Sequence, residues 1–355
     1  MKITRLHVPL TMLAGLAGAC AAPPTPHDDD LAPRAELDRA ELLGLARVDG
    51  WLVSPVLTSA DPITRVGLLV NLDEADDGSP SEAPLPLVRA VAMDDGVPGE
   101  QVDAAVTWRE GGALVLNADF TTATTAVVVR IREQDAAGLH GVAWELFVPS
   151  DEGTDEAVDA TTPNTEQWLA GWLADSGIKT RASWGARASR GCSSNTSKSK
   201  IAIHHTVTGR TLNGSYPRRL RQIQAFHMDS RGWCDVGYHF LVTADGSRWE
   251  ARPIGYLGAH VGGVNTGNVG ISLVGCFHPS GCGGLGGTTP PEAILNGAAR
   301  VVRTVARHYG IAIDSTHVKG HRQWASGTAC PGDNVVSKLS TIRSRAKDAS
   351  FPGPG

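Results

Sequence analysis

Residues 201–206 read IAIHHT, an apolar run that ends in two histidines and a threonine. The short length and the isoleucines of this run are typical of a buried strand. A strand fixes the direction of each side chain, so the end of a strand can aim an imidazole rigidly at a neighbouring loop. The stretch therefore predicts a buried strand that presents His204 or His205 to another part of the chain.

The sequence around this stretch alternates between strand and helix patterns. Residues 217–230, PRRLRQIQAFHMDS, are typical of a helix opened by Pro217. Strand and helix patterns that alternate in one region favour an α/β fold, with a mixed sheet flanked by helices. Three further strands are predicted, in GYHFLVTADG (237–246), RWEARP (248–253) and NVGISLVGCF (268–277).

The clearest helix is predicted over residues 290–309. We expect Thr289 as its N-cap, with Pro290 at the first helical position and Glu292 as the capping-box partner. Gly310 is expected to end it. Apolar side chains at helical spacing should line one face of this helix: Ile294, Ala298, Val301 and Val305.

The first half of the chain has a different pattern, with short apolar runs separated by turn-forming clusters such as DDGSPSEAP (76–84). Short strands with turns between them predict an antiparallel β-sandwich. This half shows no His, Cys or Ser cluster at catalytic spacing, which favours a spacer or a binding module. The runs are WLVSPVL (51–57), TRVGLLVN (64–71), PLVRAVAM (86–93), AAVTWR (104–109), GALVLN (112–117), TAVVVRIR (125–132) and HGVAWELFV (140–148).

These patterns divide the chain of 355 residues into two expected domains. We expect the smaller, all-β sandwich-like domain over residues 46–150 and the α/β domain over residues 166–350. An acidic linker should connect them over residues 151–165, and a short helix is expected in TEQWLAGWLADSG (165–177).

Residues 1–19 have the pattern of a secretory signal, with basic residues before an apolar stretch too short to span a bilayer. The segment AGLAGAC (14–20) resembles the lipobox of bacterial lipoproteins, in which Cys20 carries the lipid. Ordinary cleavage near Ala19 is the alternative. Residues 20–45 would then be the lipidated cysteine and a tether. We expect an exported protein of the cell envelope, held at the membrane through this lipid alone, or a secreted one.

Charge also divides the chain. Residues 28–160 carry 27 acidic and 8 basic side chains, whereas residues 167–355 carry 9 acidic and 22 basic ones. A basic half suits an anionic polymer such as nucleic acid or an anionic cell wall, although opposite charges also keep each half soluble. The basic half contains no recognisable DNA- or RNA-binding motif, so we expect no nucleic-acid partner.

The cysteines of an exported protein are expected to form disulfides. Cys276 and Cys282 bracket a tight loop, which favours a local disulfide, and Cys192 and Cys234 can then pair with each other. Apart from the predicted lipidation site, this pairing leaves Cys330 over. A metal would explain such a cysteine, because a metal-bound thiolate is a ligand and not a reactive thiol.

Residues 320–332, GHRQWASGTACPG, place His321 and Cys330 on one loop, close enough to share a metal. His204 or His205 is the best source of a third ligand. Two imidazoles and one thiolate suit a tetrahedral zinc with one open position. An open position holds water, and zinc lowers the pKa of that water toward 7. The pattern therefore predicts a catalytic zinc site.

From about Lys179 to the last helix, the chain resembles the peptidoglycan recognition proteins, the zinc amidase family that also includes phage amidase-type lysozymes. The matching segments occur in the order of the family. They are TRASWGA (180–186), IAIHHT (201–206), AFHMDSRGWCDVGYHFLVTADG (225–246), WEARPIGYLGAH (249–260), NVGISLVGCF (268–277) and GHRQWASGTACPGD (320–333).

The resemblance implies that His204, His321 and Cys330 bind zinc. It also implies catalytic roles for Tyr238 and Thr328. The implied activity is that of an N-acetylmuramoyl-L-alanine amidase, which cuts the amide between N-acetylmuramic acid and the first L-alanine of the peptidoglycan stem. Some family members have lost the zinc cysteine and only recognise peptidoglycan, so a non-catalytic binding module is the alternative.

The expected partner is peptidoglycan, bound as a muramyl peptide by a monomeric protein. His227 and His239 are expected to be structural. Four other side chains in the matching segments are expected to contact the substrate: His205, Thr206, Arg252 and His260.

Overall fold

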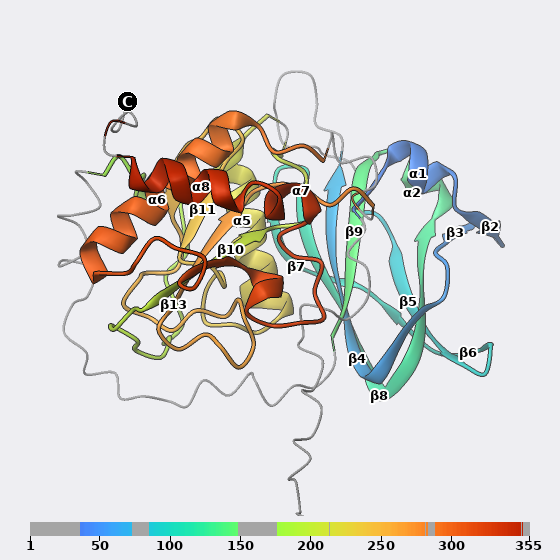
Figure 1. Cartoon of the computed structure of the whole chain (residues 1–355). Helices are drawn as coiled ribbons and strands as arrows, with labels where there is room; N and C mark the ends of the chain where they lie inside the picture. Colours follow the sequence, from blue (N-terminus) through green and yellow to red (C-terminus); the bar gives the residue numbers. More distant parts are fainter. Residues whose placement is uncertain are drawn as a thin grey trace, which may run out of the picture.

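The computed structural model describes residues 36–72, 85–147, 176–212, 214–280, 282, 288–348 and 350. The described residues form two sheets, one of nine strands and one of five, which Figure 1 shows side by side. The predicted signal segment, Cys20, most of the tether, the linker 151–165 and most of the predicted helix 165–177 lie outside the described residues.

The five-stranded sheet contains β10 (Lys200–His205), β11 (Phe240–Val242), β12 (Arg248–Glu250), β13 (Asn268–Leu273) and β14 (Val318–Gly320). Their order across the sheet is β12-β11-β13-β10-β14. Strand β10 is parallel to β13 on one side and to β14 on the other, and β11 is parallel to β13. Because β12 is antiparallel to β11, the sheet is mixed, and the predicted α/β class is confirmed.

Helices cover both faces of this sheet: α6 (Glu292–Tyr309) and α8 (Leu339–Lys347) on one face, and α4 (Arg181–Trp184) and α5 (Tyr216–Ala225) on the other. Ile203 in β10 is fully buried in the core shared with α6 and α8. Side chains alternate along a strand, so the next residue, His204, faces the side covered by α5. This alternation places the IAIHHT imidazoles in two different environments.

Three shorter helices complete the described part of this half. The π-helical turn η3 (Phe226–Ser230) continues α5, η4 (His321–Gln323) follows β14, and α7 (Asp333–Val336) precedes α8. Among the described residues, none of the helices combines the length and the apolar character that a membrane crossing requires.

The start of α6 corrects one prediction. The helix begins at Glu292 with Pro291 as its N-cap, and no side chain caps it, so the capping box expected from Thr289 is wrong. A residue that precedes proline is pushed out of the helical region, and Pro290 precedes Pro291. The chain therefore turns helical only after the second proline. The four predicted core residues of this helix are fully buried and Gly310 ends it in the left-handed conformation, as predicted.

The nine-stranded sheet is antiparallel throughout. Its strands are β1 (Glu36–Asp38), β2 (Ala46–Val48), β3 (Trp51–Val53), β4 (Leu57–Leu72), β5 (Val88–Asp94), β6 (Val97–Asp103), β7 (Ala105–Glu110), β8 (Ala113–Arg132) and β9 (Leu139–Phe147). Two short helices, α1 (Arg39–Leu43) and α2 (Glu133–Ala136), lie between strands.

The strand β8 explains the sandwich-like shape of this half. Its first part pairs with the second part of β4 and with β7, and its second part pairs with β3 and β5. Side chains from both parts, such as Leu116 and Val129, lie in one core together with Leu68 of β4 and Val88 of β5. One bent sheet therefore supplies both layers, which confirms the predicted sandwich-like architecture.

The outer face of this sheet packs against α5 and η3 of the other half. Leu69, Val115 and Ala143, from β4, β8 and β9, form a small apolar cluster with Ala225 and Phe226. The three strand residues point away from the main core of their own sheet because their neighbours along the strand fill that core. The two halves thus share a buried apolar contact.

Polar and charged groups surround this apolar contact. The guanidinium of Arg221 donates to the carboxylate of Glu110, and Arg231 forms an ion pair with Glu145 in which both side chains are almost fully buried. Gln222 also donates across the contact to Asn71, at 2.8 Å. In each of these ion pairs the acid belongs to the acidic half of the chain and the arginine to the basic half.

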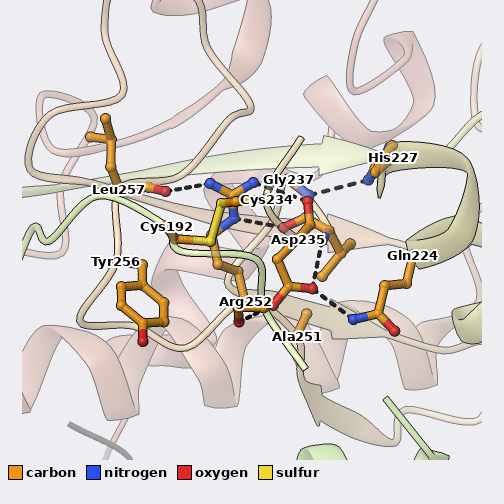
Figure 2. The surroundings of a disulfide bond; sticks show 12 residues. Cys192, Gln224, His227, Cys234, Asp235, Gly237, Ala251, Arg252, Tyr256 and Leu257 are labelled. Carbon is orange, nitrogen blue, oxygen red and sulfur yellow. Dashed lines mark hydrogen bonds between the residues drawn. A yellow bond between two sulfur atoms is a disulfide. The ribbon is translucent and has the colours of Figure 1, made fainter. Parts of the chain in front are cut away.

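Two disulfides are present in the described residues, and both are the predicted ones. Cys192 pairs with Cys234, and Cys276 pairs with Cys282. The first joins the segment before β10 to the segment after η3, close to the buried side chain of Arg252 (Figure 2).

Candidate metal centre and active site

Three side chains converge at the carboxyl edge of the parallel strands β10 and β14. His204 lies near the end of β10, and His321 directly follows β14. Ile203 pairs with Gly320, so the residues that follow them, His204 and His321, lie side by side. The two imidazole centroids are 4.7 Å apart. The loop after η4 brings Cys330 to the same place, so that one ligand atom from each of the three residues lies within 4.8 Å of the others.

The chemistry of these three side chains fits zinc. Imidazole nitrogen and thiolate sulfur are the ligands that tetrahedral zinc prefers. With ordinary bond lengths, a nitrogen and a sulfur on one tetrahedral zinc lie about 3.6 Å apart. The Sγ of Cys330 lies 3.5 Å from Nδ1 of His204. The residues present can therefore hold this metal without a large rearrangement.

Burial keeps the His204 imidazole in the form that a metal binds. Removal from water lowers the pKa of His204 well below its ordinary value, and the nearby imidazoles of His321 and His260 lower it further. A neutral ring has a lone pair to offer, whereas an imidazolium has none. Cys330 is partly exposed, whereas His204 and His321 are buried.

Tyr238 lies beside these ligands. Its ring centroid is 5.1 Å from that of His204 and 5.7 Å from that of His227. The residue is half-buried, just before β11, on the α5 side of the sheet. The structure therefore brings Tyr238 next to the candidate ligand His204, and its catalytic role stays a prediction.

The loop that carries Cys330 is held by its own hydrogen bonds. The backbone N–H of Cys330 donates to Oγ1 of Thr328, at 3.0 Å. The backbone N–H of Arg322 donates to the carbonyl oxygen of Cys330, and its guanidinium forms an ion pair with Asp333 at 2.6 Å. These bonds hold the side chain of Thr328 against the backbone of Cys330, and both residues are partly exposed.

His205 and Thr206 lie away from the ligands. Nδ1 of His205 accepts a hydrogen bond from the N–H of Phe277, on the opposite face of β10 from His204. Oγ1 of Thr206 accepts from the N–H of Gly275. Both side chains are buried, so their predicted contact with the substrate stays a prediction.

Arg252 is also buried, only 2% exposed, and its guanidinium donates to backbone carbonyl oxygens of Val236, Asp235 and Leu257 (Figure 2). Carbonyl groups of three different positions are thus tied to one side chain. This gives Arg252 a structural role in the segment that leads to Tyr238, and its contact with the substrate stays a prediction.

His260 is 2% exposed and lies behind His204, as seen from the metal site. Its Nδ1 is 3.1 Å from Nε2 of His204, and its Nε2 is 3.2 Å from the carbonyl oxygen of Asn268. Burial lowers the pKa of His260 to about 3. The predicted substrate residue is therefore in direct contact with a candidate metal ligand.

Sequence reasoning placed His227 in the core, and it is buried, but it also packs against Tyr238. Its ring centroid lies 4.9 Å from that of Trp233, and its Nδ1 accepts from the N–H of Gly237. His227 thus positions the tyrosine side of the site. The spacing of HMDSRGW offers no signal for this contact, because the π-helical turn η3 decides where the ring points.

Comparisons with known proteins agree on the α/β half. Residues 194–333 match the family model described as N-acetylmuramoyl-L-alanine amidase. The solved structure of wild-type PGRP-LB from Drosophila is similar with a TM-score of 0.40, at 28% identity, over 46% of this chain and 92% of that one. The mouse N-acetylmuramoyl-L-alanine amidase is 29% identical over 192 residues, which are 53% of this chain and 34% of that relative.

Two recognition proteins are matched over most of their length. Peptidoglycan-recognition protein SC2 of Drosophila simulans is 32% identical over 166 residues, which are 46% of this chain and 85% of that relative. Peptidoglycan recognition protein 1 of Bos taurus is 34% identical over 163 residues, which are 44% of this chain and 80% of that relative. Through its α/β half, the chain therefore belongs to the family of peptidoglycan recognition proteins and N-acetylmuramoyl-L-alanine amidases.

Proposed function

We propose that this chain is a zinc-dependent N-acetylmuramoyl-L-alanine amidase, which hydrolyses the amide between N-acetylmuramic acid and L-alanine in peptidoglycan. The observation that carries the proposal is the convergence of His204, His321 and Cys330 beside Tyr238. Three protein ligands leave one tetrahedral position open, which is the arrangement of a catalytic zinc, whereas structural zinc sites are closed by four.

Bound zinc would supply a water of lowered pKa and would polarise the amide carbonyl. The chain contributes the neutral imidazole of His204, held at the end of β10, and the sulfur of Cys330, held by the hydrogen bonds of its own loop. The carboxyl ends of β10 and β14 hold the two histidines rigidly, which keeps their geometry constant during the reaction.

Tyr238 and Thr328 stabilise the carbonyl oxygen of the amide as it gains negative charge. The hydroxyl of Tyr238 donates a hydrogen bond to this oxygen from the side of His204. Oγ1 of Thr328 uses a lone pair to accept from the N–H of Cys330, which leaves its hydroxyl proton for donation to the substrate.

The proposal places the protein in the cell envelope, where peptidoglycan is. Delivery would depend on the predicted signal segment and on the lipid at Cys20, or on secretion after cleavage near Ala19. The binding of a muramyl peptide by this chain is part of the proposal. The 32% identity with peptidoglycan-recognition protein SC2 of Drosophila simulans supports it.

The test uses the purified chain from residue 21 onward, which keeps both sheets, with peptidoglycan sacculi as substrate. New amino groups of L-alanine are measured with and without a chelator, and after zinc is restored. Cys330→Ala is the loss-of-ligand variant, and Ser337→Ala, an exposed residue in the turn after α7, is the matched surface control.

Release that a chelator abolishes, zinc restores and Cys330→Ala lacks would support the amidase. Absence of release from a folded protein that still sediments with sacculi would overturn it in favour of a peptidoglycan-binding module. Release that persists in Cys330→Ala would overturn the assignment of this residue as a zinc ligand.

A further inference from the structure

A chain of hydrogen bonds runs from the candidate metal site into the core. It begins at Nε2 of His204, which lies 3.1 Å from Nδ1 of His260, and continues from Nε2 of His260 to the carbonyl oxygen of Asn268, at 3.2 Å. His204 and Asn268 have no solvent exposure, and His260 has 2%. Water therefore does not compete for these bonds.

The carbonyl oxygen of Asn268, where this series of hydrogen bonds ends, decides which ring nitrogens of His260 and His204 carry a proton. A carbonyl oxygen can only accept, so Nε2 of His260 carries a hydrogen. In a neutral ring the other nitrogen is then bare, and Nδ1 of His260 accepts from Nε2–H of His204. Nδ1 of His204 is consequently the atom with a lone pair, and this is the atom that lies 3.5 Å from the sulfur of Cys330.

The opposite direction would need a charged His260. If Nδ1 of His260 donated to His204, its ring would carry both protons and a positive charge, because Nε2 already donates to Asn268. A buried cation is costly unless a carboxylate pairs with it. Within the described residues, the hydrogen bonds of the His260 ring go to an imidazole and to a carbonyl, which leaves the neutral arrangement as the favoured one.

The fold leaves a closely fitting space for the His260 ring. A Cβ added at Gly270 would lie 2.6 Å from Cδ2 of His260, and a Cβ at Gly258 would lie 2.6 Å from its Nε2. The backbone N–H of His260 also donates to Oδ1 of Asn265, which holds the turn that carries it. Backbone and ring are thus fixed independently of any ligand.

We propose that His260 is a positioning residue that fixes the tautomer of His204, with Nε2 protonated and Nδ1 offered to the metal. The proposal rests on the proposed zinc site and assigns to His260 a role other than substrate contact. An imidazole ligand whose second nitrogen is held in this way is oriented and made more basic toward the metal, and loss of such a partner weakens metal binding about 10- to 100-fold.

The first experiment measures zinc affinity by competition with a chromophoric chelator, for the chain from residue 21 onward. His260→Leu removes the acceptor and should weaken zinc binding about 10- to 100-fold. His260→Asn places an amide oxygen where Nδ1 lies, so it should rescue most of this loss. Thermal unfolding of both variants in chelator confirms that the metal-free proteins are folded. Unchanged zinc affinity in a folded His260→Leu would overturn the proposal. If the KM of this variant for peptidoglycan then rises, His260 contacts the substrate instead.

The second experiment reads the tautomer directly in wild-type protein without metal, so it depends on no variant. Nitrogen-15 NMR of histidine-labelled protein, with His204 assigned through His204→Gln, should show a protonated Nε2 and a bare Nδ1. The reverse pattern would overturn the proposal. Wild-type protein that binds no zinc would end the proposed function, and this NMR measurement would still decide the tautomer.

Discussion

At the residue scale, the hydroxyl of Tyr238 is the group beside His204 that we propose as a donor to the oxygen of the cleaved amide. Its ring packs between His204 and His227, so removal of the oxygen leaves the packing in place. Tyr238→Phe should lower kcat about 100- to 1,000-fold, the effect of losing one donor to a developing oxyanion. The measurement is the rate of L-alanine amino-group release at saturating zinc.

The matched control for this variant is Tyr309→Phe, at the end of α6 and on the other face of the sheet, which should leave kcat unchanged. Zinc affinity should be the same in both variants and in wild type. Full activity of Tyr238→Phe would remove Tyr238 from the mechanism.

The buried side chain of Lys198 should make the free energy of unfolding depend on pH. Its ammonium is buried and donates to Oδ1 of Asn195 and to the carbonyl oxygen of Tyr256, and burial, with a smaller effect of Arg252, lowers its pKa to about 7. An unfolded lysine titrates near 10.5. Between these two values the unfolded chain binds the proton and the folded chain does not, so the free energy of unfolding rises with pH, by at most about 1.4 kcal/mol per unit.

The comparison that isolates this group is denaturant unfolding of wild type and Lys198→Met at pH 7, 8 and 9, in the presence of chelator. The stability of wild type relative to the variant should increase by about 1–3 kcal/mol over this range. A difference that stays constant with pH would show that Lys198 is charged in the folded protein.

The sequence predicted which residues form the candidate metal site better than it predicted which neighbouring residues are buried. The spacing left His204 and His205 open as the third ligand, and the alternation of β10 separates them, since His205 accepts from Phe277 on the opposite face. The solvent exposure of the predicted substrate-binding residues could not be predicted from the sequence. His205, Arg252 and His260 are all buried, because sequence segments near a site also contain the residues that hold it together.

At the scale of elements, β13 shows why a glycine stands beside His260, the ring that contacts the candidate ligand His204. Gly270 leaves room for the His260 ring, and a Cβ there would lie 2.6 Å from it. Gly270→Ala should displace the ring, weaken zinc binding about 10-fold and cost about 1–3 kcal/mol of stability. Chelator competition and denaturant unfolding measure the two effects.

Gly297→Ala is the matched control, because a Cβ at Gly297 in α6 would lie 2.6 Å from Cγ1 of Val242, in the core between α6 and β11. It should cost comparable stability while the folded protein keeps its zinc affinity. Equal zinc affinity of Gly270→Ala and Gly297→Ala would show that Gly270 does not affect the candidate metal site.

Element types were predictable where periodicity is strong, and element limits were not. The buried face of α6 and the strand β10 follow from local patterns. The sequence predicted two strands where β8 is one, because the polar segment 118–124 looks like a break. Its threonines are β-branched and keep the backbone extended, so pairing with β4 continues beyond the apolar runs.

At the scale of the whole molecule, the division of charge has a structural counterpart. The ion pairs between the halves join an acid of the nine-stranded sheet to an arginine of α5 or of the segment after η3: Glu110 pairs with Arg218 and Arg221, and Glu145 pairs with Arg231. The sequence suggested only a charged partner or solubility as reasons for this division. Pairing within one chain could not be predicted, since it depends on which faces the two sheets turn toward each other.

The pair Arg231–Glu145 is the one expected to matter most for stability. Its side chains are 6% and 5% exposed, and the guanidinium of Arg231 also lies over the ring of Trp233, 4.6 Å from its centroid. Glu145→Gln would leave the arginine as a buried charge without its counter-ion, which costs about 3–5 kcal/mol. The free energy of unfolding in denaturant, followed by tryptophan fluorescence, measures this loss.

Asp103→Asn is the control, because the pair Arg89–Asp103 on the outer strands has the same chemistry with side chains 29% and 52% exposed. An exposed pair contributes about 1 kcal/mol or less. If Glu145→Gln costs no more than Asp103→Asn, the contact between the sheets rests on its apolar cluster. If it costs several times more, the ion pair Arg231–Glu145 holds the acidic sheet to the α/β half, at the segment between η3 and Tyr238 that leads to the candidate metal site.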